Sequence, residues 1–487
     1  MEELSIEFEN IEVSYLDRVV LKIPRLAVHQ FDRIGVVGRN GAGKSTLLKL
    51  IDGQVKPGKG DVKRFADFAY FDQLTSPDDK EIDFELMGKL SIPQTDIEHF
   101  SGGELTRMKL AQIFSSYHEG LLIDEPTTHL DEEGIKFFID ELRYYYGALI
   151  LVSHDRHVLD QLVTKIWEVE DGCVTEYTGN YSDYVEQKKL EKRQQQEAYE
   201  KYVKEKSRLM KAAEKKMKKA DKINQASGQM SKKEAKAKPN TMFATKEKGS
   251  SQKSVQRAAK AIEHRLEQLE EAEAPKEEQM IRFHQSNTLK LHNKFPIMAD
   301  RLTLRAGNKT LLKESSFQFP LGETIAITGK NGSGKTTLLH HILKCGKGIT
   351  ISPKAVIGSY GQMDYQFESD ETVIVYMKNR SDYNESKIRA ALSAMGFNGN
   401  DIKKNVRDLS GGEAIRLILC QLFLGRYNVL VLDEPTNFLD VFCIEALERF
   451  LKGYEGTVLL VSHDRTFINR VADRIYSIED QTLILKS

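Results

Sequence analysis

Four short runs of consecutive apolar residues, two in each half of the chain, are the clearest pattern in the sequence. They are residues 33–38 (RIGVVG), 120–124 (GLLID), 324–329 (TIAITG) and 429–433 (VLVLD). Runs of this length without polar alternation are typical of parallel strands that are covered on both faces. They predict an α/β fold in each half of the chain.

The segment between the two halves has a different pattern. Residues 185–223 contain strong helix formers and neither Pro nor Gly, and Val203, Met210 and Met217 are spaced seven residues apart. A second apolar stripe is formed by Val255, Ala259, Ile262, Leu266 and Leu269. Two narrow stripes joined by a polar loop at about 224–252 predict an antiparallel α-helical hairpin. Its first helix, roughly 35–40 residues, would be about 50–60 Å long.

Charge is distributed unevenly along the chain. Between Lys188 and Lys260 there are 23 Lys and Arg against 8 Asp and Glu, a local net charge of +15, whereas the whole chain carries −1. The insert is therefore basic and the rest of the chain is acidic. This asymmetry predicts a polyanionic partner for the insert alone.

Membrane insertion and secretion are not expected. No run of about 18 apolar residues occurs, and the first residues, MEELSIEFEN, lack the pattern of a signal peptide. The four cysteines, Cys173, Cys345, Cys420 and Cys443, are scattered without metal or redox spacing. We expect a cytoplasmic protein with reduced thiols.

A series of motifs occurs twice in the same order. The pairs are GRNGAGKS (38–45) and GKNGSGKT (329–336), SGGE (101–104 and 410–413), LLIDEPTTHLD (121–131) and VLVLDEPTNFLD (429–440), and LVSHDR (151–156 and 460–465). The chain is therefore a tandem duplication, with domains expected at 1–183 and 286–487 around an insert at 184–285.

The first motif of each repeat predicts a phosphate loop. GxxxxGK[ST] follows an apolar strand in both halves, so its backbone N–H groups and the next helix can hold a nucleotide's phosphates. Lys44 and Lys335 would reach the β- and γ-phosphates, and the hydroxyls of Ser45 and Thr336 would bind Mg²⁺. The other expected ATP-binding residues are Gly38, Asn40, Gly41, Gly43, Thr46, Gly329, Asn331, Gly332, Gly334 and Thr337.

Acidic residues at the carboxyl ends of two strands complete a hydrolytic site. Asp124 and Asp433 lie at the sheet edge where ligands bind in such folds, and they can hold Mg²⁺ through water. The adjacent Glu125 and Glu434 can polarise the attacking water. The remaining candidates are His154 and His463 as γ-phosphate contacts, and Gln73 and Gln362 as further ligands of Mg²⁺ or water.

Each SGGE motif precedes a helix and forms a second anion-binding helix start. These residues are Ser101, Gly102, Gly103 and Glu104 in the first half and Ser410, Gly411, Gly412 and Glu413 in the second. Each half therefore has two phosphate-binding ends but one lysine loop.

The ordered set resembles the ATP-binding-cassette (ABC) ATPases over essentially all of the chain outside the insert. The resemblance implies a head-to-tail pairing in which Ser101–Gly103 complete the site of Lys335 and Ser410–Gly412 complete the site of Lys44, with two Mg-ATP per chain. It also implies that an aromatic residue, Tyr15, stacks on adenine. The matching position in the second half is Ala306, beside Arg305, which could stack on the base instead.

Two cassettes, a basic hairpin between them and no membrane part resemble the ABC-F family of ribosome-binding ATPases. GNYSDY (179–184) and DEPTTHLD look like family features, although Thr128 and Phe438 depart from the usual Asn and His. Only 27 residues separate Gln73 from Ser101, which leaves no room for the extra arm of some housekeeping members. The segment PNTMFATKEKG (239–249) and LHNKFPI look most like the macrolide and streptogramin B resistance branch.

That branch implies a monomer that enters the ribosomal exit site with ATP bound, contacts large-subunit rRNA and the P-site tRNA, and displaces the drug. The expected contact residues at the hairpin tip are Asn240, Thr241, Met242, Phe243, Ala244 and Thr245. An aromatic tip on a basic lever suits structured RNA, whereas a solvated spacer would need neither feature.

Other functions share part of this pattern. A housekeeping translation factor of the same architecture would bind the ribosome without protecting it from drugs. The tandem ATPase subunit of an importer would have no use for the basic hairpin. A DNA-repair ATPase would carry its coiled coil inside one cassette, whereas here both cassettes are uninterrupted.

Overall fold

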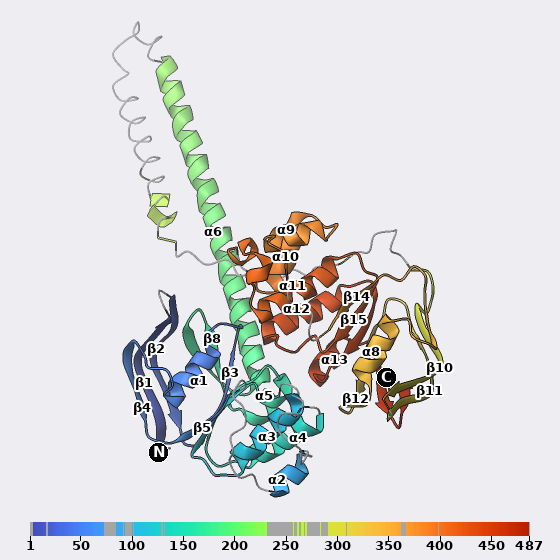
Figure 1. Ribbon diagram of the computed structural model, residues 1–487. Helices are drawn as coiled ribbons and strands as arrows, with labels where there is room; N and C mark the ends of the chain where they lie inside the picture. Colours follow the sequence, from blue (N-terminus) through green and yellow to red (C-terminus); the bar gives the residue numbers. More distant parts are fainter. Residues whose placement is uncertain are drawn as a thin grey trace, which may run out of the picture. The chain divides into compact units, whose positions relative to one another are not determined.

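The computed structural model describes residues 3–15, 18–72, 84–90, 92, 100, 102–127, 130, 132–230, 257, 261–262, 264–266, 268–269, 283, 291–307, 309–361, 367–397 and 399–486. The chain divides into two compact units. One holds residues 1–184 together with 279–487, and the other holds residues 185–278. The first unit contains two α/β cassettes, and the second contains most of the long helix α6 (Figure 1).

The first cassette is built on a six-stranded sheet of order β5-β6-β7-β3-β8-β9. All neighbouring strands pair in parallel except β8 and β9. The strands are β3 (Arg33–Gly38), β5 (Phe68–Phe71), β6 (Gly120–Asp124), β7 (Ala148–Val152), β8 (Lys165–Glu170) and β9 (Cys173–Thr178). A second, antiparallel sheet joins β2 (Arg18–His29), β1 (Leu4–Tyr15) and β4 (Lys59–Arg64). The helices are α1 (Lys44–Asp52), α2 (Phe84–Lys89), α3 (Gly102–Phe114), α4 (Glu132–Arg143) and α5 (Arg156–Leu162).

The second cassette repeats this plan, with a six-stranded sheet of order β14-β15-β16-β12-β17-β18. Its strands are β12 (Thr324–Gly329), β14 (Ile357–Tyr360), β15 (Val429–Asp433), β16 (Thr457–Val461), β17 (Arg474–Glu479) and β18 (Thr482–Leu485). The antiparallel sheet joins β11 (Lys309–Phe319), β10 (Ile297–Ala306) and β13 (Ile349–Ile351). The helices are α8 (Lys335–Leu343), α9 (Val373–Asn379), α10 (Glu385–Ala394), α11 (Gly411–Leu424), α12 (Val441–Lys452) and α13 (Arg465–Val471), with 3₁₀ turns η4 (Asp401–Lys403) and η5 (Val406–Asp408).

The four apolar runs of the sequence are β3, β6, β12 and β15, as predicted. Every residue of β6 and β15 is buried, because helices cover both faces of a parallel sheet. Each fully buried Leu, Ile or Val of these strands stabilises the fold by roughly 1.5–3 kcal/mol before the entropy of ordering is subtracted. The expected duplication and α/β class are confirmed.

Phe283 shows how the chain re-enters the second cassette after the insert. Its side chain is 1% exposed, and its ring centroid lies 5.0 Å from that of Phe450 and 5.4 Å from that of Phe423. Its backbone N–H donates to Gly453 O at 3.0 Å. This residue therefore closes an aromatic cluster in the second cassette.

Helix α6 (Tyr181–Met230) is longer than the sequence predicted. It contains 50 residues, which corresponds to about 75 Å, and it continues beyond residue 223, where we expected a loop to begin. The reason is that Gly228 costs a helix only about 1 kcal/mol, whereas the first strong helix breaker, Pro239, comes later. The tip residues 240–245 and most of the expected returning helix lie outside the described residues.

Candidate nucleotide-binding sites

The two phosphate loops have the backbone conformation that phosphate binding needs. Gly41 and Gly43 have φ of +77° and +108°, and the matching Gly332 and Gly334 have +69° and +106°. Only glycine adopts this left-handed region freely. No atom lies within 4 Å of a Cβ built on Gly41, so the loop faces open space at that point.

The two lysines occupy equivalent positions at the starts of α1 and α8. Lys44 Nζ donates to Gly38 O at 2.9 Å, and Lys335 Nζ donates to Gly329 O at 2.7 Å. Both side chains are 7% exposed. Burial lowers the pKa of Lys44, although Glu125 and other nearby carboxylates oppose this effect. Each ammonium group is thus held inside its own loop.

The hydroxyl group that follows each lysine meets the aspartate at the end of a neighbouring strand. Ser45 donates to Asp124, and Thr336 donates to Asp433. Asp433 Oδ1 is buried and lacks a hydrogen-bond partner among the described residues. A hydroxyl and a carboxylate side by side, with an oxygen left unpaired, are suitable ligands for Mg²⁺. Gln73 and Gln362 lie outside the described residues.

The adjacent glutamates share an unusual geometry. Glu125 and Glu434 have φ of +49° and +50°, a conformation that is strained for a residue other than glycine. Each carboxylate accepts a hydrogen bond at 3.3 Å from the backbone N–H of the histidine in its own cassette. In both, Oε1 is buried and accepts no hydrogen bond of good geometry from the described residues, although a histidine ring nitrogen lies close to it. Burial raises the pKa of Glu125 to about 8 and that of Glu434 to about 7.

The histidines lie beside these glutamates. His154 Nε2 is 3.1 Å from Glu125 Oε1, and His463 Nε2 is 3.4 Å from Glu434 Oε1. Burial lowers the pKa of His154 to about 3, so its ring is neutral at physiological pH. The structure thus brings lysine, hydroxyl, aspartate, glutamate and histidine together at the carboxyl edge of each parallel sheet.

The second SGGE motif starts α11 with a capping box. Ser410 Oγ accepts from the backbone N–H of Glu413, and the Glu413 carboxylate accepts from the backbone N–H of Ser410 at 2.9 Å. A Cβ built on Gly412 would lie 3.9 Å from Asn40 Nδ2 of the first cassette. In the first motif, α3 begins at Gly102 and includes Gly103 and Glu104, whereas Ser101 lies outside the described residues.

The residues that follow the second Asp-Glu pair contact the first phosphate loop, a role that their sequence does not predict. The backbone N–H of Asn40 donates to Asp440 Oδ2 at 2.7 Å, and Asn40 Nδ2 donates to Phe438 O at 2.9 Å. The repeated Leu-Asp after each Asp-Glu-Pro was the available signal. The partner could not be found from it, because these contacts join residues about 400 positions apart.

The adenine candidates lie on strand ends. Tyr15 ends β1 and is 49% exposed, and Arg305 is exposed near the end of β10. Stacking of either side chain on a base stays a prediction.

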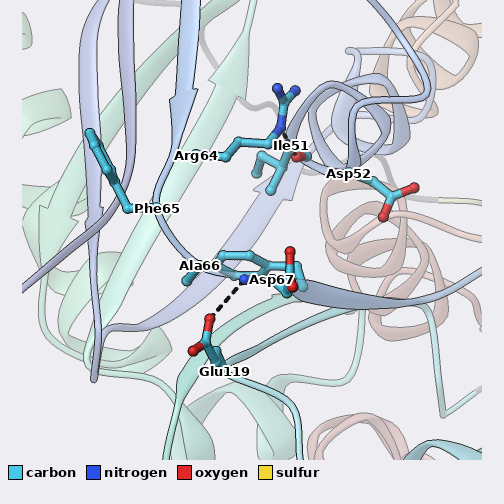
Figure 2. Close-up of a pocket in the computed structure, with 8 residues that line it drawn as sticks. Ile51, Asp52, Arg64, Phe65, Ala66, Asp67 and Glu119 are labelled. Carbon is cyan, nitrogen blue, oxygen red and sulfur yellow. Dashed lines mark hydrogen bonds between the residues drawn. The ribbon is translucent and has the colours of Figure 1, made fainter.

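A separate cavity of about 290 Å³ lies in the first cassette between α1 and the start of β5 (Figure 2). Arg64 donates to Ile51 O at 2.7 Å, and the backbone N–H of Asp67 donates to Glu119 Oε2 at 2.9 Å. These groups satisfy one another, and none of the predicted site residues lines the cavity.

Known proteins resemble this chain over nearly its whole length. Two family profiles, both described as ABC transporter, match residues 21–85 with 312–437 and residues 167–242. The erythromycin resistance ATP-binding protein MsrA of Staphylococcus epidermidis is 40% identical over 99% of both chains. The ribosome protection protein VmlR of Bacillus subtilis is 35% identical over 95% of this chain and 85% of its own, and the energy-dependent translational throttle protein EttA of Haemophilus influenzae is 30% identical over 95% and 90%.

The chain belongs to the ABC-F family. It is therefore an ATPase, and ABC ATPase domains generally bind ATP with Mg²⁺. Among solved structures, RNase-L Inhibitor matches with a TM-score of 0.64 at 19% identity, covering 98% of this chain and 90% of that one, which shows a shared fold. No helix in the described part of this ABC-F chain is long and apolar enough to cross a bilayer.

Proposed function

We propose that this ABC-F ATPase binds the bacterial ribosome when both sites hold ATP, and that its insert displaces a macrolide-type antibiotic from the large subunit. The observation that carries the proposal is a 50-residue helix, part of a strongly basic segment that follows the first cassette and precedes the second along the chain. Relatives named for erythromycin resistance and ribosome protection support it, since both match nearly the whole chain.

The chemistry of each site follows from its geometry. Lys44 and Lys335 would neutralise phosphate charge, while Ser45 with Asp124, and Thr336 with Asp433, would hold one Mg²⁺ per site. The buried glutamates would accept a proton from the attacking water, because desolvation keeps their pKa near the working pH.

Closure of the cassettes would make binding depend on ATP. A Cβ built on Gly412 would lie 3.9 Å from Asn40 Nδ2, so the second signature is near the first phosphate loop. A nucleotide that touches both would stabilise the paired arrangement, which is a shift of an existing equilibrium. Hydrolysis removes that bridge and would release the protein from the ribosome.

The basic insert supplies the recognition of RNA. Its excess of Lys and Arg would bind phosphates at the exit site, with an affinity that falls steeply as salt rises. The tip residues around Met242 and Phe243 would act beyond the helix, near the P-site tRNA and the drug.

A pelleting experiment tests the proposal. The variant Glu125→Gln with Glu434→Gln should retain ATP and the paired state, so it should sediment with ribosomes only when ATP is present and less at high salt. Radiolabelled erythromycin bound beforehand should be lost from the pellet. The matched control adds Lys44→Ala and Lys335→Ala, which should abolish the ATP-dependent sedimentation.

The other outcomes separate the remaining functions. If the protein sediments with ribosomes and the drug stays bound, a general translation factor is favoured. The 30% identity to EttA is consistent with that function. Absence of sedimentation at both salt concentrations would contradict ribosome binding and restore the importer subunit as the leading alternative.

A further inference from the structure

Arg156 and Arg465 stand at matching positions of the two cassettes, but the residues that could face them from the other cassette differ in charge. Asp124–Gln161 and Asp433–Arg470 align without a gap, so every residue of one segment has a counterpart in the other. We call the site built on the first phosphate loop the Lys44 site and the one built on the second the Lys335 site. The asymmetry centres on Arg156, which stands two residues after His154.

Arg156 is the first residue of α5, and its guanidinium reaches helix α12 of the second cassette. Nη1 donates to Glu448 Oε1 at 2.7 Å, and Nη2 lies 3.5 Å from Val441 O and 4.0 Å from Glu445 Oε1. Arg156 is 2% exposed and Glu448 is 7% exposed. Glu448 also accepts from Arg470 at 3.2 Å. A buried carboxylate between two guanidiniums is costly to leave with one partner removed.

Helix α12 thus contacts the first cassette at both edges of the Lys44 site. At its N-terminus Asp440 accepts from the phosphate loop, and Arg39 of that loop lies 5.8 Å from the Phe442 ring. Eight residues later, about 12 Å along the helix, Glu448 holds the helix that follows His154. One rigid element therefore connects the loop that would bind phosphate with the segment that carries the histidine.

The reciprocal arrangement cannot be built from the sequence. The counterpart of Glu448 on α4 is Ile139, that of Glu445 is Lys136, and that of Arg470 is Gln161. Whatever Arg465 contacts, it does not meet a carboxylate at the position equivalent to Glu448.

We propose that Arg156 is a positioning residue of the Lys44 site, which acts by fixing α5 and His154 against α12, and that the two ATP sites are therefore unequal. The Lys44 site depends on this ion pair for its geometry, and the Lys335 site does not. The proposal uses the hydrolytic roles of Glu125 and Glu434 given under the proposed function.

Site-selective hydrolysis tests the proposal in the full-length protein. The Glu434→Gln background leaves hydrolysis to the Lys44 site, and the Glu125→Gln background leaves it to the Lys335 site. Arg156→Gln should lower kcat at least tenfold in the first background and less than threefold in the second. The matched control Arg465→Gln should cause no comparable loss at the Lys335 site. Equal losses at both sites, or a reciprocal effect of Arg465→Gln, would overturn the inequality.

Two further measurements separate positioning from simple misfolding. Arg156→Lys keeps the positive charge but loses the planar, forked set of N–H donors of the guanidinium. Its kcat should be within about threefold of that of the protein with Arg156, and the melting temperatures of the two proteins should be the same. In the otherwise unmodified protein, Arg156→Gln with Glu448→Gln should be no slower than Arg156→Gln alone. Additive losses would show that the two residues act separately. This cycle needs no assignment of hydrolytic roles, so it judges the pair even if Glu434→Gln and Glu125→Gln fail to isolate the sites.

Discussion

Replacing Glu434 by Gln should stabilise the nucleotide-free protein while it removes the proposed catalytic group. Glu434 is 7% exposed, and its Oε1 accepts no hydrogen bond of good geometry from the described residues. Burial, and then the neighbouring Asp433, raise its pKa from 4.5 to about 7. The folded protein therefore holds a carboxylate at a place that favours its neutral form. The amide of Gln has nearly the same shape and no charge.

The magnitude follows from the linkage between proton binding and folding. A carboxyl group whose pKa is raised in the folded state favours folding below its unfolded pKa, and this contribution is lost as pH rises through the folded pKa. The rise in the pKa of Glu434 from 4.5 to about 7 corresponds to about 3 kcal/mol, and the whole of this free energy applies at pH 8. The Glu434→Gln variant should therefore be more stable than its parent by about 3 kcal/mol at pH 8, and by almost nothing near pH 4.5. For a cassette of this size the gain is roughly 6–12 °C in Tm.

Calorimetry of nucleotide-free protein between pH 4.5 and 8 measures this difference. Glu368→Gln, an exposed position in the same cassette, is the control for removal of one negative charge and should show no such gain. A gap between Glu434→Gln and its parent that stays constant with pH would refute the reasoning, because it would show that the carboxylate is not what the folded state disfavours.

Three further changes test the fold. Phe283→Ala should lower the free energy of unfolding of the second cassette by about 3–5 kcal/mol, because it leaves a cavity in a buried aromatic cluster. Circular dichroism should report this loss. The fluorescence of the single tryptophan, Trp167 of the first cassette, should report unfolding at the same denaturant concentration as in the parent protein. Gly38→Ala should destabilise the first cassette, since its Cβ would lie 2.5 Å from a backbone oxygen of β8, and tryptophan fluorescence in urea should show it. Tyr184→Phe removes a 2.7 Å hydrogen bond to buried Glu168 and should cost about 1–3 kcal/mol in the same assay.

The sequence predicts those parts of the sites whose residues lie close together along the chain. A phosphate loop needs glycines, a lysine and a hydroxyl within eight positions, and the pattern GxxxxGK[ST] states this directly. Residues such as Asp124 could be placed because the carboxyl ends of parallel strands meet at one edge.

The contacts that the sequence could not predict join distant segments. Arg156 and Glu448 are 292 residues apart. Arg156 ends a repeated motif, but nothing in that motif, or in the sequence around Glu448, indicates that the two residues form a pair. Asp440 was visible as part of a repeated motif, but its partner Asn40 belongs to the other cassette. The end of α6 was missed for a different reason. The polar segment 224–252, with its Gly, Pro, Ser and Asn residues, was predicted to be a loop throughout, although its first glycine costs a helix little.

The two ends of the insert join the cassettes through different interactions. A hydrogen bond holds the first end and aromatic packing holds the second. On entry, Tyr184 donates to Glu168 of β8, the strand next to the first phosphate-loop strand. On return, Phe283 is buried between Phe423 of α11 and Phe450 of α12, the helix that holds Arg156 through Glu448. A movement of α12 on nucleotide binding would therefore reach the return end of the insert through packing and the Lys44 site through an ion pair. One helix thus links the return end of the insert with the Lys44 site. Under the proposed function, a substitution that loosens α12 should therefore uncouple ATP hydrolysis from release of the ribosome.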